Sequence, residues 1–209
     1  MIAPLAWGRR VRDETGTPLG NERGSLRIST LPESDRALLI LDMLADRVTG
    51  PSAVPGAAAI VRFVHGELRY FRERGRLVLF ACTAFDLADP PAILQELTPR
   101  TDERVMWKNA PSAFFDTDLD ASLRELKVRR LTLVGLETHT SVLFTAADAV
   151  ARGLQVVVPD PCVCSSSPED HRFALRQIRE VWPRWPRWPH GDQDIDDTGP
   201  FRRGGAEVP

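Results

Sequence analysis

Short runs of almost wholly apolar residues alternate with longer amphipathic segments through the middle of the chain, and this alternation limits the fold more than any other feature. Strands buried on both faces of a parallel sheet have near-continuous apolar sequences, whereas helices that cover a sheet repeat apolar residues every three or four positions. The apolar runs predict strands at 37–42, 76–83, 104–107, 130–135 and 155–158. The amphipathic segments predict helices at 57–74, 119–126, 142–152 and 168–181, the last with Ser167 as its N-terminal cap.

Strands that alternate with helices favour an α/β fold, because right-handed crossovers place helices on both faces of a parallel sheet. We therefore predict a three-layer, Rossmann-like α/β/α sandwich over residues 36–181. Residues 1–35, rich in Gly, Arg, Thr and Pro, are predicted to form an N-terminal arm. Residues 182–209 begin with three Trp-Pro pairs, which exclude helix and central strand, and are predicted to be a disordered tail. The alternative is that Trp182, Trp185 and Trp188 dock on a neighbouring subunit.

The composition narrows the possible partners. The 27 lysines and arginines nearly balance 29 aspartates and glutamates, so the chain lacks the broad positive field that nucleic-acid binding requires. No stretch approaches the roughly 20 apolar residues of a membrane span, and the arginines after the short apolar start differ from a secretory signal. Three cysteines, with Cys162 and Cys164 too close to bridge, favour a reducing compartment, and we predict a cytoplasmic protein.

Three polar residues follow predicted strands at the edge where parallel sheets bind ligands. Asp42 ends the first strand, Lys108 follows the third, and Ser141 stands at the start of the helix after the fourth. Taken singly, such residues are commonly turn formers, solvated amines or helix caps. Together they form a carboxylate, an amine and a hydroxyl that can converge on one small-molecule substrate.

Three segments resemble the isochorismatase-like hydrolases, also called cysteine hydrolases. They are Leu-Leu-Ile-Leu-Asp-Met at 38–43, Lys-Asn-Ala-Pro-Ser-Ala-Phe-Phe-Asp-Thr-Asp-Leu at 108–119, and Val-Gly-Leu-Glu-Thr-His-Thr-Ser-Val at 134–142 with Thr-Ala-Ala-Asp-Ala at 145–149. The resemblance covers 37–178 and implies hydrolysis of a small amide, carbamoyl or vinyl-ether substrate by a homo-oligomer, a dimer or tetramer.

The resemblance also implies roles for individual residues. Asp42 and Lys108 match the family's acid/base and its electrostatic partner, while Ser141 stands where the family has its nucleophilic cysteine. A cis peptide bond is implied between Leu136 and Glu137, where backbone N–H groups would bind the substrate oxygen. His139 is either a local hydrogen-bonding residue at the entrance of the helix or a further residue that contacts the substrate.

Ser141 leaves alternatives open, because a hydroxyl is a far weaker acid than a thiol. The protein can be a slow amide hydrolase, an isochorismatase-like enzyme in which Asp42 protonates a vinyl ether, or an inactive member that binds a small molecule or serves as an assembly subunit. The cysteines offer a further source of a thiol: Cys82 is predicted to be core, and Cys162 and Cys164 lie near the same sheet edge. No metal or cofactor is predicted, since Asp86 lacks the closely spaced histidines of the nicotinamidase-type metal site.

Overall fold

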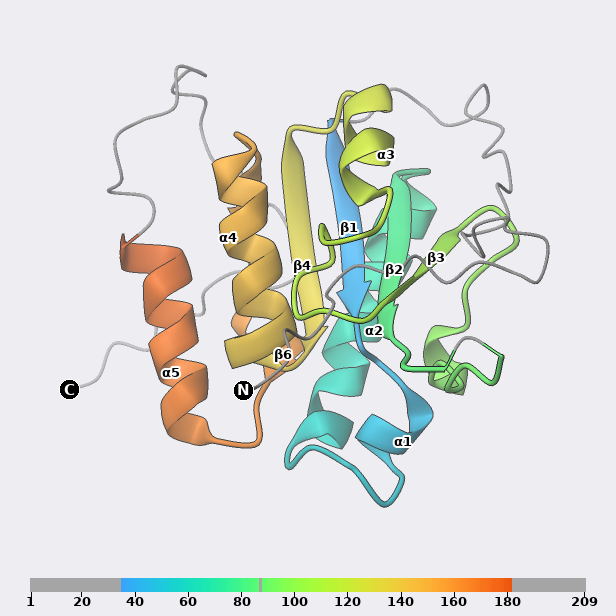
Figure 1. Cartoon of the computed structure of the whole chain (residues 1–209), viewed down its shortest axis with the longest axis vertical. Helices are drawn as coiled ribbons and strands as arrows, with labels where there is room; N and C mark the ends of the chain where they lie inside the picture. Colours follow the sequence, from blue (N-terminus) through green and yellow to red (C-terminus); the bar gives the residue numbers. More distant parts are fainter. Residues whose placement is uncertain (1–34, 87, 182–209) are drawn as a thin grey trace, which may run out of the picture.

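The computed structural model describes residues 35–86 and 88–181, and its centre is a parallel sheet (Figure 1). The strands are β1 (Arg36–Leu41), β2 (Leu77–Thr83), β3 (Arg104–Lys108), β4 (Arg130–Leu136), β5 (Gln155–Val157) and β6 (Val163–Cys164). The sheet runs in the order β3-β2-β1-β4-β5, with β6 also paired to β4, and every pair is parallel. The predicted α/β class is confirmed.

Helices cover both faces of this sheet. They are α1 (Ala45–Val48), α2 (Ala57–Glu73), α3 (Leu119–Glu125), α4 (Leu143–Ala151) and α5 (Pro168–Arg176). Figure 1 shows α2 behind the sheet and α3 and α4 in front of it, which gives the predicted three layers. Ser167 caps α5 as expected, because its hydroxyl accepts a hydrogen bond from the backbone N–H of Asp170 at 3.2 Å.

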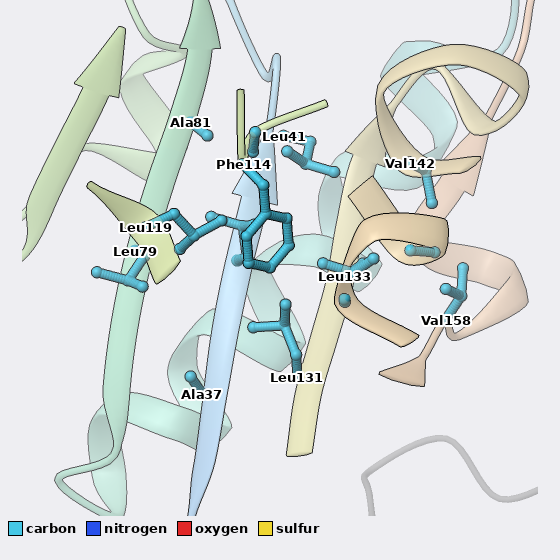
Figure 2. Packing of buried hydrophobic residues seen from close by; sticks show 14 of the residues in the cluster. Ala37, Leu41, Leu79, Ala81, Phe114, Leu119, Leu131, Leu133, Val142 and Val158 are labelled. Atoms are coloured by element: carbon cyan, nitrogen blue, oxygen red, sulfur yellow. The ribbon is translucent and has the colours of Figure 1, made fainter. Parts of the chain in front are cut away.

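Alternate residues of each strand build two separate cores. On β1, Leu39 and Leu41 pack in the cluster that contains α3 and α4 residues, some of which are drawn in Figure 2. Leu38 and Ile40, which face the other way, pack against α2. Because both faces are apolar, β1 reads in the sequence as an unbroken hydrophobic run rather than as an alternating one.

Several short elements were not predicted from the sequence, among them α1, β6 and η3 (Thr138–Val142). Helix α1 has four residues and β6 has two, which is too short for either to show a period of apolar residues. The third of these, η3, is a π-helical turn that precedes α4, so the helix predicted from residue 142 begins earlier than expected. The chain from 45 to 55 and from 159 to 164 is therefore more regular than the loops that the sequence suggested.

The strand order reverses between β1 and β4. The chain moves from β1 to β2 and β3 on one side, and then crosses to β4 and β5 on the other. Ligands of open α/β sheets bind at such a switch point, beyond the carboxyl ends of the strands. The ends of β1 and β4 are therefore where a functional site is expected.

The predicted arm up to residue 34 and the predicted tail at 182–209 lie outside the described residues. Within the described part of the chain, no helix combines the length and the apolar character needed to cross a membrane. The cytoplasmic location and the homo-oligomeric state stay predictions.

Candidate active site

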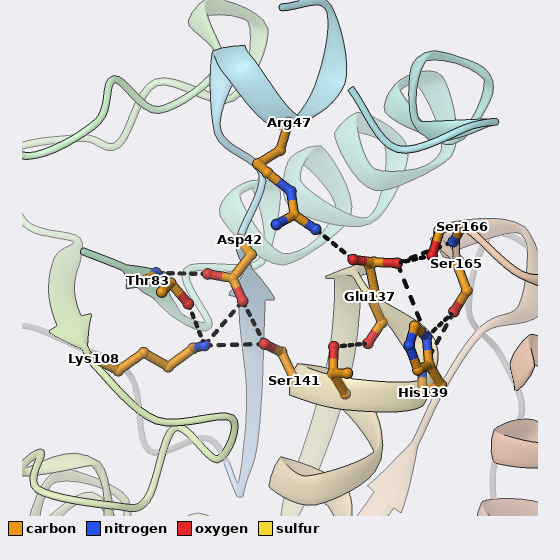
Figure 3. Close-up of polar contacts among 10 residues, drawn as sticks. Asp42, Arg47, Thr83, Lys108, Glu137, His139, Ser141, Ser165 and Ser166 are labelled. Atoms are coloured by element: carbon orange, nitrogen blue, oxygen red, sulfur yellow. Dashed lines mark hydrogen bonds and ion pairs between the residues drawn. The ribbon is translucent and has the colours of Figure 1, made fainter. Parts of the chain in front are cut away.

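Asp42 directly follows β1 at the switch point, and its backbone has the left-handed φ of 52°. Its amide donates to the carbonyl of Ala81 at 3.1 Å. Oxygen Oδ1 of its carboxylate accepts from the backbone N–H of Thr83 at 2.6 Å, and Oδ2 accepts from the hydroxyl of Ser141 at 2.5 Å (Figure 3). The carboxylate is thus held by one backbone N–H at Oδ1 and faces Ser141 with Oδ2.

Lys108 ends β3, two strands away from β1, and its side chain reaches past the end of β2. Its Nζ donates to Thr83 Oγ1 at 2.7 Å, to the carbonyl of Ala110 at 3.2 Å and to Ser141 Oγ at 3.0 Å. The same amine lies 2.9 Å from Asp42 Oδ2, and its side chain is only 1% exposed. A lysine this buried is tolerated because a counter-charge and several acceptors replace its water.

Ser141 belongs to η3, the turn that follows β4, and is buried. Gly135 allows this turn to approach Asp42. The φ of Gly135 is 112°, and a Cβ atom there would come within 2.0 Å of the Leu41 carbonyl oxygen. Glycine is therefore required where the end of β4 passes the end of β1. The structure brings the three residues singled out in the sequence into mutual hydrogen-bonding distance.

The peptide bond between Leu136 and Glu137 is cis, as the family resemblance implied. The Leu136 side chain is fully buried in the core, so only its backbone borders the site. The Glu137 carbonyl accepts hydrogen bonds from the amides of Thr140 and Val142, at 3.1 and 3.2 Å, and thereby holds the η3 turn.

A second polar cluster surrounds the carboxylate of Glu137 (Figure 3). Its Oε1 accepts from Arg47 Nη2 at 2.5 Å, and its Oε2 accepts from the backbone N–H and the hydroxyl of Ser166, at 3.0 and 2.8 Å. Burial raises the pKa of Glu137, but the Ser166 donors and the Arg47 charge outweigh it and leave the pKa below its usual value. Glu137 is thus an anion that joins helix α1 to the segment before α5.

His139 lies beside this cluster rather than in the Asp42 group. Its Nδ1 is 2.9 Å from Ser165 Oγ and 4.0 Å from Glu137 Oε2. Its backbone N–H also donates to Ser165 Oγ at 3.3 Å. The sequence analysis counted His139 among the substrate-binding residues, and its described contacts are local.

The surroundings of the three cysteines argue against any of them as an alternative nucleophile. Burial, with the charge of Asp42, raises the pKa of Cys82, which is 1% exposed. Burial, with the charge of Glu67, raises that of Cys162. Burial and then Glu137 raise the pKa of Cys164 to about 11. Since the thiolate is the reactive form, these raised pKa values disfavour all three cysteines as nucleophiles.

Sequence reasoning missed several residues of the site. Thr83 contacts both Asp42 and Lys108, and its only signal was its place at the end of a predicted strand. Arg47, Ser165 and Ser166 lie in segments without a clear periodic pattern, and no signal in the sequence linked them to Glu137. Within 35–86 and 88–181, no group of three or more His, Cys, Asp or Glu side chains is arranged to hold a metal ion.

Comparison with known proteins decides the family. The family model described as "Isochorismatase domain" matches residues 36–183. This chain belongs to the isochorismatase family. The isochorismatase family protein YaaI of Bacillus subtilis strain 168 is 30% identical over 167 residues, which cover 72% of this chain and 92% of YaaI.

Other relatives of this isochorismatase-family chain are named for the amides that they hydrolyse. Maleamate amidohydrolase of Pseudomonas putida is 27% identical over 166 residues, covering 68% of this chain and 78% of that enzyme. The crystal structure of nicotinamidase PncA from Bacillus subtilis superposes with a TM-score of 0.66 and 26% identity, covering 72% of this chain and 97% of that one. The family is thus one of hydrolases.

Proposed function

We propose that this isochorismatase-family protein hydrolyses a small amide or carbamoyl compound, with Asp42, Lys108 and Ser141 as its catalytic residues. The observation that carries the proposal is the hydroxyl of Ser141, which lies 2.5 Å from Asp42 Oδ2 and 3.0 Å from Lys108 Nζ. A nucleophile in contact with a base, and a base held by further groups, is the arrangement typical of covalent catalysis. The names of the amide-hydrolysing relatives support the same substrate class.

The contacts suggest how the reaction would proceed. Ser141 Oγ attacks the carbonyl carbon while its proton passes to Asp42, and Lys108 stabilises the negative charge that develops on Oγ. Backbone N–H groups beside the Leu136–Glu137 peptide would hold the carbonyl oxygen as it becomes negative. When the intermediate collapses, Asp42 returns the proton to the leaving amine. Water then attacks the acyl-serine ester while Asp42 accepts its proton, and Asp42 returns that proton to Ser141 Oγ as the bond between Oγ and the acyl carbon breaks.

The test compares the wild-type protein with Asp42→Asn on a panel of small amides, carbamoyl compounds and isochorismate. Loss of the base is expected to lower kcat by about 100-fold or more. Amides and carbamoyl compounds should be turned over, whereas turnover of isochorismate alone would indicate that Asp42 acts as an acid on a vinyl ether. Equal rates for the two proteins would reject the proposal.

A second candidate function is binding of a small molecule without turnover, and Ser141 favours it. A hydroxyl between the same neighbours is a much weaker acid than a thiol, so a family scaffold with serine here can be a disabled enzyme. The test is Ser141→Cys followed by intact-mass detection of an adduct with an electrophilic amide analogue. An adduct on the variant, together with no turnover by the wild type, supports binding. Rapid wild-type turnover eliminates it.

A further inference from the structure

We propose that Arg47 selects substrates that carry a carboxylate group, and that Glu137 is the positioning residue that holds its guanidinium in place. This inference rests on the proposed amide hydrolysis at Ser141 and names the substrate class. It concerns the end of the substrate that does not react. The residues that carry it belong to two loops that meet over the switch point of the sheet.

Arg47 is close to the proposed catalytic residues in both sequence and space. It lies on α1, five residues after Asp42, while Glu137 lies four residues before Ser141. Figure 3 shows its guanidinium directed from α1 toward Glu137, which directly precedes the turn that carries Ser141. A small molecule with its amide carbon at Ser141 would therefore extend toward Arg47.

The guanidinium is only partly satisfied by the protein. Its Nη2 donates to Glu137 Oε1 at 2.5 Å. Its Nε is one of two buried side-chain polar atoms in the described part of the chain that have no hydrogen-bond partner, the other being Asp118 Oδ1. Such unsatisfied donors are rare in native proteins and call for an explanation. That Nε atom is itself buried, but the side chain as a whole is 38% exposed, so an added group can reach the outer part of the guanidinium.

Glu137 is not available to bind the substrate itself. Its side chain is 14% exposed, and both of its oxygens already accept hydrogen bonds from Arg47 or Ser166. Ser166 donates two hydrogen bonds to the Glu137 carboxylate, so the position of Glu137 does not depend on Arg47 alone. Glu137 can therefore fix the position of the Arg47 guanidinium. The groups offered to a ligand are consequently N–H donors and not acceptors.

A carboxylate is the ligand that these donors fit best. A guanidinium has five N–H donors and no acceptor, in a planar arrangement that matches two carboxylate oxygens. The nearby charges, Asp42 with Lys108 and Glu137 with Arg47, cancel in pairs, so one added anion is not opposed by an unpaired negative charge. A neutral amide would place no negative charge beside the exposed part of the guanidinium.

The experiment measures kcat/KM for a matched pair of amides. Maleamate carries a carboxylate, and cis-but-2-enamide has a methyl group in its place. We expect the wild-type protein to prefer maleamate by about 10- to 100-fold, and Arg47→Met to abolish that preference mainly by raising KM for maleamate. Equal kcat/KM for the two amides in the wild type, or an unchanged preference in Arg47→Met, would overturn the inference.

Three further variants keep the test specific. Arg47→Lys retains the charge without the planar donors and should keep only part of the preference. Glu137→Gln should lower the preference for maleamate, because it loosens Arg47 and raises KM for maleamate more than KM for the neutral amide. Arg62→Met, on the exposed face of α2, is the matched control and should change kcat/KM for neither amide. Thermal melting identifies any variant that fails to fold.

Binding separates failure of this inference from failure of the proposed function. If neither amide is hydrolysed, calorimetry on Ser141→Ala compares maleamate with cis-but-2-enamide, with and without Arg47→Met. Tighter binding of maleamate that depends on Arg47 supports the carboxylate site even though hydrolysis is rejected. Equal binding of the two amides rejects the carboxylate site, whatever the outcome for hydrolysis.

Discussion

The ion pair between Lys108 and Asp42 is almost completely removed from water, with side chains 1% and 9% exposed. Two buried charges gain little net stability as a pair, but removing one leaves the other uncompensated. The pair therefore makes stability depend on both residues together. Both are also proposed catalytic residues, so stability and activity have to be measured separately.

We expect Lys108→Met to lower the free energy of unfolding by about 3 to 5 kcal/mol, because it leaves the Asp42 carboxylate buried without its counter-charge. The double variant Asp42→Asn with Lys108→Met should lose less free energy of unfolding than the two single variants lose in sum. Urea denaturation measures all three. The matched control is Lys127→Met, which changes an exposed lysine and should have little effect. Additive losses would contradict this account of the pair.

Thr83 is one of the residues of the site that the sequence analysis did not single out. Its hydroxyl accepts from Lys108 Nζ at 2.7 Å and its amide donates to Asp42 at 2.6 Å. Thr83→Val keeps the amide and the shape but removes the acceptor, so Lys108 would be less well placed. We expect about a 10-fold loss in kcat/KM. Thr83→Ser restores a hydroxyl and should recover most of the rate; if it does not, the hydroxyl is not the cause.

At the scale of secondary structure, the contact between the ends of β1 and β4 determines whether Ser141 reaches Asp42. This contact depends on Gly135, where an added Cβ would lie 2.0 Å from a backbone oxygen of Leu41. A backbone atom cannot move aside as a flexible side chain can. The four-residue helix α1 depends similarly on the Arg47–Glu137 ion pair for its contact with the end of β4.

Gly56 provides a matched control for Gly135, because both have a positive φ, 86° and 112°, but a Cβ at Gly56 would meet nothing within 4 Å. Gly56→Ala should therefore lower the free energy of unfolding only by the backbone strain, about 1 kcal/mol. Gly135→Ala adds the clash and should lower the free energy of unfolding by at least about 2 kcal/mol more. Chemical denaturation of the two variants tests this. Similar losses would show that the close approach at Gly135 is unimportant.

At the scale of the whole molecule, a glutamate on the buried face of α2 affects stability. Glu67 is 4% exposed, and burial raises its pKa from 4.5 to about 7. Between pH 4.5 and about pH 7, Glu67 keeps its proton in the native protein but has released it in the unfolded chain. Stability therefore falls as the pH rises from 4.5 through 7, and above pH 7 the full cost of ionising a buried carboxyl is present.

Glu67→Gln should remove this dependence, because an amide cannot ionise. As the pH rises from 4.5 to about 8, the free energy of unfolding of the variant relative to the wild type should increase by up to about 3 kcal/mol. Denaturation at several pH values measures the difference. Glu73→Gln, on the same helix at an exposed position, is the control and should show no comparable gain. A pH-independent difference for Glu67→Gln would mean that burial does not perturb this group.

The layers, the parallel sheet and the placing of Asp42, Lys108 and Ser141 at its carboxyl edge followed from the order of apolar runs and the polar residues after them. Those features are local in the sequence, since an apolar run and the residue that ends it are neighbours along the chain. Asp42 and Ser141 were predicted to meet because parallel strands end at the same edge, and their hydrogen bond at 2.5 Å agrees with that.

The ion pair of Arg47 with Glu137, the role of Thr83 and the short strand β6 came only from the folded chain. Arg47 and Glu137 are 90 residues apart and lie on segments without a periodic pattern, so nothing along the chain indicates that they meet. Their contact depends on how the loops after β1 and β4 pack together. Packing of irregular backbone is set by long-range contacts rather than by the order of residues, which is why the sequence identified the proposed catalytic group and not its surroundings.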